Sequence, residues 1–289
     1  GMSGDFITIS GDTGSGKSSF FNNILCQAVL DGFPVYSWSG EMTPQQQTTR
    51  MLAAFSGINS LKIKAGKYID DVNDFTSLEN AIEKIIGKDV FLDFGHMNIQ
   101  KLTSTIINKH RVEGIKVFLL DRLELFDLSV KRDEDQAKGV FTSRLRSLAN
   151  ELGVTIVMAA QLRKSFESRP RKIPEIVDIK GAGAIIQDST KIFLLYRPEL
   201  YGLPEFEDGF TSDGKGEIFI KKNSHGGLGK ERVDFNKYQT TWGVNFHLAP
   251  TASSGATGLT KDGFLTDDAG ENKSSLTGPK NSPDEGVPF

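Results

Sequence analysis

The sequence contains one cysteine, Cys26, among its 289 residues. A single thiol excludes an internal disulfide framework and a cysteine-rich metal site, and it suits a reducing compartment. Nowhere do 18 apolar residues follow one another, and no basic segment leads into an apolar one at the N-terminus, so neither a membrane span nor a secretory signal is predicted. We therefore expect a cytoplasmic protein that does not associate with a membrane.

An excess of charge of one sign is also missing from most of the chain. The formal net charge is −3, and residues 250–289 account for it with three lysines and six carboxylates. Half of these forty residues are Gly, Pro, Ser or Thr, so they offer too little apolar surface to offset the entropy of ordering. The sequence predicts a folded domain over residues 1–249 and a disordered acidic tail over residues 250–289.

Between residue 5 and about residue 196, short apolar or β-branched runs alternate with helical patterns. This alternation predicts βαβ units and a mostly parallel, twisted sheet flanked by helices, which is an α/β fold. Glycine-punctuated segments later in the chain indicate antiparallel edge strands. The expected parallel strands are 6–10, 35–39, 90–94, 117–120, 155–159 and 192–196, and the expected edge strands are 217–222, 232–235 and 241–246.

Two helix starts carry capping signals. Residues 43–46 supply a hydroxyl at the N-cap, a proline at the first helical position and an amide two residues later, and Gly57 follows as a stop. Thr76 and Glu79 have the spacing of a second capping box, before a helix that Gly87 would end.

Residues 11–18, GDTGSGKS, match the phosphate-binding pattern G-x-x-x-x-G-K-S/T between an apolar strand and a helix. Glycines let successive backbone N–H groups point at phosphate oxygens, and the helix N-terminus adds partial positive charge. Lys17 would reach the β- and γ-phosphates of ATP, and the Ser18 hydroxyl would bind Mg²⁺. The predicted nucleotide-binding residues are Gly11, Asp12, Thr13, Gly14, Ser15, Gly16, Lys17, Ser18 and Ser19.

A second acidic ligand for Mg²⁺ is expected at the end of a buried strand. Asp121 ends the longer apolar run, at 117–120, and Asp93 follows a shorter one. Asp121 is therefore preferred, with Asp93 as the alternative.

Further motifs resemble the C-terminal motor domain of DnaB-type replicative helicases and the helicase half of phage primase-helicases, over about residues 5–246. Residues 39–42, SGEM, followed by 50–53, RMLA, are similar to the family's "LEM…RMLA" motif, and residues 121–125, DRLEL, to its "DYLQL". The resemblance implies a RecA-like P-loop NTPase that hydrolyses ATP with Mg²⁺. It assigns the activation of the attacking water to Glu41, which fits a carboxylate at a strand's C-terminal end.

Residues 148–163 are similar to "LAKELNVPVV..SQL.R", and residues 179–188 to "DLRESGSIEQDAD". The first likeness implies that Gln161 senses the γ-phosphate. The second implies that this region and the loop before it grip single-stranded DNA in a central channel. The residues expected to bind DNA are Arg163, Lys164, Arg169, Arg171, Lys172 and Lys180; the alternative is a solvated mobile loop.

The chain departs from the family at the arginine finger, which acts on the ATP of a neighbouring subunit. That position falls on Asn223 or Ser224, so Lys221 or Lys222 is the expected substitute. An ammonium lacks the bidentate fork of a guanidinium, so slow or partner-dependent hydrolysis is expected.

Self-association is expected because the family completes its sites between subunits, as a hexamer, another ring or a filament. Gly1 before Met2 is typical of a cloning scar, and if Met2 is the start, assembly rests on the motor domain alone. Residues 282–289, SPDEGVPF, look like the acidic tip of bacterial single-stranded-DNA-binding proteins, which predicts a docked replication partner; an inert tail is the alternative.

The sequence thus predicts an oligomeric motor ATPase on single-stranded DNA, similar to a phage or mobile-element replicative helicase. A RecA-like recombination or annealing ATPase is one alternative. Another is a nucleotide-gated loader or adaptor that hydrolyses little ATP.

Overall fold

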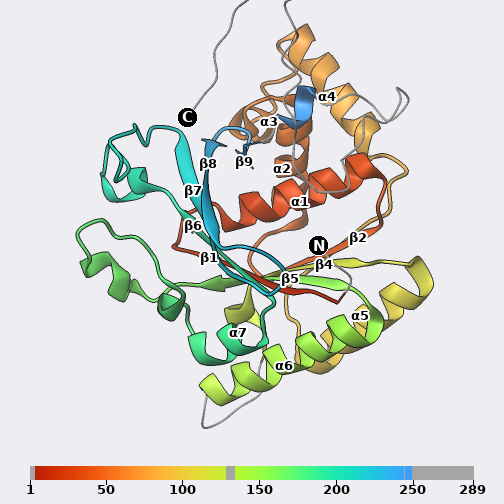
Figure 1. Ribbon diagram of the computed structural model, residues 1–289. Helices are drawn as coiled ribbons and strands as arrows, with labels where there is room; N and C mark the ends of the chain where they lie inside the picture. The colour runs from red at the N-terminus through yellow and green to blue at the C-terminus, as the bar shows by residue number, and fades with distance from the viewer. Residues whose placement is uncertain (1–3, 128–133, 244, 249–289) are drawn as a thin grey trace, which may run out of the picture. The chain divides into compact units, whose positions relative to one another are not determined.

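A mixed sheet of nine strands organises the computed structural model, which describes residues 4–127, 134–243 and 245–248 (Figure 1). The strand order is β3-β2-β4-β5-β1-β6-β7-β8-β9. Strands β1 to β6 run parallel, and β7, β8 and β9 add on antiparallel beside β6. The strands are β1 Phe6–Gly11, β2 Val35–Ser39, β3 Val90–Phe94, β4 Val117–Asp121, β5 Thr155–Gln161, β6 Lys191–Tyr196, β7 Lys215–Asn223, β8 Gly229–Asn236 and β9 Thr241–Trp242.

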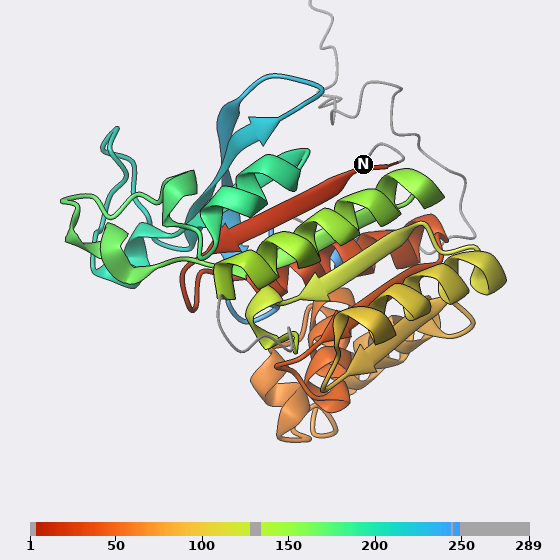
Figure 2. The ribbon, with the colours of Figure 1, turned by 90° about the horizontal axis from the view of Figure 1, so that it is seen from below.

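Helices cover both faces of the sheet (Figure 1). One face carries α1 Lys17–Asp31, α2 Pro44–Ser56, α3 Ser60–Lys64 and α4 Val72–Ile85. The other carries α5 Ile99–Glu113, α6 Glu134–Leu152 and α7 Ala182–Asp188, which lie side by side in Figure 2. Short 3₁₀ turns complete the connections: η1 Leu123–Leu125, η2 Lys164–Ser168, η3 Ile176–Asp178, η4 Pro198–Tyr201 and η5 Phe246–Leu248.

Each face of the sheet has its own hydrophobic core. Along β5, Ile156 and Met158 pack into the core beneath α5, α6 and α7, whereas Val157 and Ala159 pack into the core beneath α1 and α2. Because both faces are buried, the central strands are mostly apolar, and the few polar side chains in them are small, as Thr8 and Ser10 of β1 are. Cys26 of α1 is fully buried, and burial raises the pKa of its thiol.

The structure confirms the predicted α/β fold with antiparallel C-terminal strands. Two predicted strands, 35–39 and 90–94, have the predicted bounds, and the other parallel strands differ by one or two residues. The strand predicted at 241–246 is wrong beyond Trp242, because Gly243 takes a φ of 63° and residues 246–248 form η5. Among the described residues, no helix is long and apolar enough to cross a membrane.

The two predicted helix caps have different outcomes. Thr43 accepts a hydrogen bond from the Gln46 N–H, and the Gln46 side chain accepts one from the Thr43 N–H, so the capping box of α2 is confirmed. The box predicted at Thr76 is wrong, because α4 begins one turn earlier. Its cap is Asp71, whose carboxylate accepts the N–H groups of residues 73 and 74.

Candidate functional site

The candidate site lies where β1, β2, β4 and β5 end, at one edge of the sheet. Gly11 at the end of β1 is paired with Gln161 at the end of β5, and Ser39 at the end of β2 is paired with Asp121 at the end of β4. The carboxyl ends of parallel strands meet at the same edge, so residues far apart in sequence converge there.

The loop between β1 and α1 contains the pattern predicted at residues 11–18 and is called the P-loop below. It depends on glycine at Gly16, the N-cap of α1, whose φ is 95°. A Cβ atom at this position would lie 2.7 Å from Nε1 of Trp242 and 2.9 Å from the Phe235 ring. Both the left-handed backbone and the close approach of two aromatic rings therefore require a residue without a side chain.

Lys17 opens α1 and folds back over this loop. Its ammonium donates to the carbonyl oxygens of Gly11 at 2.7 Å and Asp12 at 2.8 Å. Burial lowers the pKa of Lys17, and the nearby carboxylate of Asp121 opposes that effect. The ammonium is thus held against the backbone of the loop that is predicted to bind phosphate.

Ser18 and Asp121 lie side by side: the Ser18 hydroxyl donates to Oδ2 of Asp121 at 2.7 Å. The Asp121 residue is 4% exposed, and burial raises the pKa of its carboxyl while the Ser18 hydroxyl and Lys17 oppose the rise. The rival Asp93 is exposed on β3, the outermost strand on one side of the sheet, where it accepts a hydrogen bond from Tyr36. The structure therefore brings Asp121, and not Asp93, to the P-loop.

A cavity of about 220 Å³ adjoins these groups, and Glu41 and Arg50 line it together with Lys17, Ser18, Ser19 and Asp121. Glu41 lies 3.5 Å from the guanidinium of Arg122. Arg50 has a buried Nη1 atom without a hydrogen-bond partner among the described residues. Burial lowers the pKa of Arg50, and Asp121 and Glu41 oppose the effect.

Sequence reasoning quoted Arg50 as part of a motif and gave it no role. The signal that could have revealed its role is its spacing from Glu41. Arg50 lies nine positions later, on α2, and both residues line the same cavity.

Gln161 reaches the P-loop from the tip of β5. Its Nε2 donates to the Thr13 hydroxyl at 3.2 Å, and its Oε1 accepts from the Lys180 ammonium at 2.9 Å. Its backbone N–H donates to Glu124 at 2.9 Å. The carboxamide therefore lies against the loop that is predicted to hold phosphate.

The P-loop is also supported by the antiparallel strands, which sequence reasoning missed. Trp242 of β9 donates from Nε1 to the carbonyl of Gly16 at 3.0 Å. Arg197, which follows β6, donates to the carbonyl of Gly14 at 3.1 Å and stacks with its guanidinium carbon 3.7 Å from the Phe235 ring centre. No local pattern marks these contacts, because they join segments about 180 to 230 residues apart.

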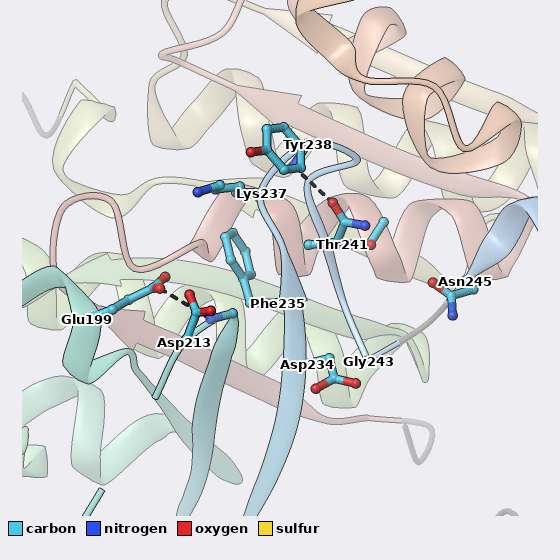
Figure 3. A pocket seen from close by; sticks show the side chains of 11 residues that line it. Glu199, Asp213, Asp234, Phe235, Lys237, Tyr238, Thr241, Gly243 and Asn245 are labelled. Carbon is cyan, nitrogen blue, oxygen red and sulfur yellow. Dashed lines mark hydrogen bonds between the residues drawn. The ribbon is translucent and has the colours of Figure 1, made fainter. Parts of the chain in front are cut away.

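A second cavity, of about 520 Å³, adjoins the first at Phe235, which lines both (Figure 3). Figure 3 shows Glu199 and Asp213 on one wall and the side chains of Phe235, Lys237 and Tyr238 on another. The lining thus combines two aromatic rings with polar groups next to the P-loop.

The cations predicted to bind DNA fall into different environments. Lys164 is 81% exposed, and Arg163 and Arg171 are also exposed. Arg169 instead donates twice to the buried Asp178, at 2.6 and 2.9 Å, so it stabilises the loop between β5 and α7. Lys172 packs over the Tyr201 ring at 5.5 Å, and the Tyr201 hydroxyl donates to Asp12 of the P-loop at 3.1 Å.

Lys221 and Lys222, predicted to act on a neighbouring subunit, contact their own chain. Lys221 pairs with Glu175 at 3.0 Å, and Lys222 donates to the carbonyl of Ile186 at the end of α7. The predicted partner-docking tip at 282–289 lies outside the described residues. Among the residues that the structure does describe, no group of three or more His, Cys, Asp or Glu side chains is placed to hold a metal ion.

A mostly parallel sheet with a P-loop after β1, a buried aspartate at the end of β4 and a glutamine at the tip of β5 defines the class of RecA-like P-loop NTPases. The family model described as "DnaB-like helicase C terminal domain" matches residues 1–243, and the chain belongs to this family.

Two curated relatives show the extent of the likeness. The replicative DNA helicase DnaB of Haemophilus influenzae is 30% identical over 246 residues, which cover 80% of this chain and 49% of the relative. A probable plasmid replicative DNA helicase of Chlamydia psittaci is 29% identical over 236 residues, covering 81% of this chain and 50% of the relative. The chain thus spans about half the length of these relatives.

Solved structures agree on the fold. The ATPase domain of G40P superposes with a TM-score of 0.76 at 24% identity, covering 84% of this chain and 85% of that one. A DnaB-like replicative helicase, described with its interactions with primase, has a TM-score of 0.76 at 23% identity, covering 83% of this chain and 57% of that one.

Proposed function

We propose that this chain is the motor part of a replicative DNA helicase: it hydrolyses ATP with Mg²⁺ and moves along single-stranded DNA. The observation that carries the proposal is that one cavity of about 220 Å³ beside the P-loop is lined by Lys17, Ser18, Glu41 and Asp121. Replicative helicases among its relatives support the same function.

The donor set of this cavity fits Mg²⁺ bound together with a nucleotide. Ser18 and Asp121 provide a hydroxyl and a carboxylate 2.7 Å apart, both hard oxygen donors. Mg²⁺ in nucleotide sites takes one or two protein oxygens and completes its shell with phosphates and water, so no larger protein cluster is required. Bound there, Mg²⁺ would neutralise charge on the phosphates.

Glu41 is proposed to accept a proton from the attacking water, and Arg50 to position the acidic groups. A carboxylate that lines the cavity beside the phosphate loop is placed to orient water in line with a γ-phosphate. Arg50 lies near both Asp121 and Glu41 and still has an unpaired buried Nη1 donor, which suits a phosphate oxygen.

The second cavity is proposed to take the nucleoside. It begins at Phe235, where the phosphate cavity ends, and its volume of about 520 Å³ suits a small organic ligand. The rings of Phe235 and Tyr238 offer stacking surfaces, and the carboxylates of Glu199, Asp213 and Asp234 offer acceptors for ribose hydroxyls.

DNA is proposed to bind at the exposed cations Arg163, Lys164 and Arg171 and at the half-buried Lys172, with Lys180 beside Gln161. Contacts of this kind are independent of sequence, as translocation requires. Self-assembly into a ring or filament, the trans role of Lys221 or Lys222, and the division into a motor domain at 1–249 and a tail at 250–289 belong to the same proposal.

The test compares ATP hydrolysis by the intact protein, Lys17→Ala and Glu41→Gln, each with and without single-stranded DNA. We expect DNA to stimulate the intact protein, and both variants to lose activity by two orders of magnitude or more, on the scale of removing a general base. Glu41→Gln should still bind ATP, whereas Lys17→Ala should bind it weakly.

An intact protein that binds ATP but hydrolyses it no faster than Glu41→Gln, with or without DNA, would contradict the motor proposal. A nucleotide-gated adaptor would then account better for the site.

A further inference from the structure

Lys180 joins the candidate DNA surface to the P-loop. Two segments run antiparallel here: Arg163 N–H donates to the Asp178 carbonyl at 2.6 Å, and Lys180 N–H donates to the Gln161 carbonyl at 2.9 Å. Between these bonds, residues 162 and 179 form an isolated antiparallel bridge. The backbones of Gln161 and Lys180 are therefore held against each other, and their side chains are the parts free to rearrange.

The Lys180 side chain determines which way the Gln161 carboxamide points. Its ammonium donates to Oε1 of Gln161 at 2.9 Å, and Nε2 of Gln161 then donates to the Thr13 hydroxyl at 3.2 Å. An ammonium is a donor only, so it selects the oxygen of the amide and turns the NH₂ group toward the P-loop. The resulting line of contacts runs from residue 180 through residue 161 to residue 13.

We propose that Lys180 is a positioning residue that exchanges Gln161 for a DNA phosphate and thereby couples DNA binding to nucleotide sensing. With Lys180 on Gln161, the amide is kept on Thr13. When the ammonium moves to a phosphate of bound single-stranded DNA, the amide is released and can turn toward the γ-phosphate. This inference rests on the proposed function and specifies how its two ligands would communicate.

The chemistry favours the exchange in the presence of DNA. The amide oxygen of Gln161 is neutral, whereas a phosphate oxygen is anionic, so the Lys180 ammonium gains a charge–charge attraction on the phosphate that the amide does not offer. Lys180 is partly exposed, so its flexible four-carbon stem can swing outward without opening the core.

The exchange makes a reciprocal prediction. If DNA frees Gln161 to contact a γ-phosphate, then a nucleotide that carries a γ-phosphate must strengthen DNA binding by the same factor. ADP lacks that group and should leave the amide on Thr13. The affinity for DNA therefore reports the state of Gln161 even where hydrolysis is slow.

The experiment measures the dissociation constant of a fluorescein-labelled oligo-dT by anisotropy, in Mg²⁺ with either a non-hydrolysable ATP analogue or ADP. The intact protein is expected to bind DNA at least about five-fold more tightly with the analogue, the lower end of typical coupling. In Lys180→Ala this ratio should fall to about 1. Lys180→Arg, which keeps a cation on a long stem, should restore it.

The control is Lys101→Ala, which removes an exposed lysine from α5 and should leave the ratio unchanged. Gln161→Ala should also reduce the ratio to about 1, and adding Lys180→Ala to it should reduce the ratio no further, because the two residues act in series. A thermal melt of each variant checks that the fold is intact.

Three outcomes would overturn the inference: a ratio near 1 in the intact protein, a ratio in Lys180→Ala equal to that of the intact protein, or a further change in the double variant. If the intact protein nevertheless hydrolyses ATP and binds DNA, only this inference fails. If it neither binds DNA nor hydrolyses ATP, the proposed function fails with it.

Discussion

At the scale of single residues, Lys17 and Asp121 show how the site keeps two opposite charges in a buried setting. Burial acts against the ionised form of both groups, since it lowers the pKa of Lys17 and raises that of Asp121. Their mutual attraction and the Ser18 hydroxyl offset only part of this cost. The buried charges therefore destabilise the folded protein, and the nucleotide and Mg²⁺ proposed to bind here would relieve that cost.

Asp121→Asn is therefore expected to increase the free energy of unfolding at pH 7 while it abolishes ATP hydrolysis. In the folded protein, burial raises the pKa of Asp121 above the ordinary value of an aspartate. The folded state therefore binds more protons than the unfolded state between the two pKa values, and stability falls as pH rises through the folded-state pKa. Urea unfolding without nucleotide, from pH 3.5 to 7, should show a gain that shrinks toward low pH.

The control is Asp93→Asn, at the exposed rival position, which should leave hydrolysis intact. An Asp121→Asn protein less stable than its parent at pH 7 would contradict this account of the buried charge.

At the scale of elements, the antiparallel strands act as a brace on the P-loop. Trp242 is 2% exposed, packs 5.0 Å from the Phe235 ring and is tied to α1 by two hydrogen bonds between its backbone and Asn23. The Gly16 carbonyl, which already accepts the first helical hydrogen bond from the Phe20 N–H at 2.9 Å, also accepts from the Trp242 indole. Strands β8 and β9 therefore help to hold the shape of the phosphate loop.

Trp242→Phe is expected to weaken ATP binding, whereas Trp38→Phe is not. Both tryptophans are buried, and each donates from Nε1 to a glycine carbonyl at 3.0 Å: Trp242 to Gly16, and Trp38 to Gly95. Both variants should lose about 1 kcal/mol of stability with the hydrogen bond. Only Trp242→Phe releases the P-loop, so only it should raise KM for ATP several-fold, measured in steady-state assays. Equal effects on KM would rule out the brace.

At the scale of the whole molecule, the positions of the charged residues matter more than the net charge. Residues 1–249 carry no formal net charge, yet arginines and lysines gather in the segment between β5 and α7. The structure divides these cations into those that hold the loop together, as Arg169 does with Asp178, and those that face solvent, as Lys164 does.

This division predicts different effects for two charge removals. Lys164→Ala should reduce the slope of log K for single-stranded DNA against log salt by about 0.7, the value of one phosphate contact, with little change in stability. Arg169→Ala should instead cost about 1–3 kcal/mol of stability, since it leaves the buried Asp178 with fewer donors. DNA titrations between 50 and 200 mM salt, with urea unfolding, would separate the two; a larger salt effect for Arg169→Ala would refute the division.

The sequence by itself determined the local features of this protein. The apolar runs of β2 and β3, the capping box at Thr43 and the P-loop at residues 11–18 depend on a few neighbouring residues, so pattern and spacing were enough to predict them. The choice of Asp121 over Asp93 also followed from run length, because the more central strand is the more apolar one.

Only the tertiary structure decided what meets at the edge of the sheet. No local pattern encodes the hydrogen bonds from Trp242 to Gly16 and from Lys180 to Gln161. The same is true of the unpaired donor of Arg50, which lines the cavity beside the P-loop. These features depend on strand order, which places β4 and β5 between β1 and β2, and on the contact of β9 with α1. Contacts between residues so far apart in sequence depend on the free energy of the complete fold. They cannot be predicted from the few neighbouring residues that make up a local pattern.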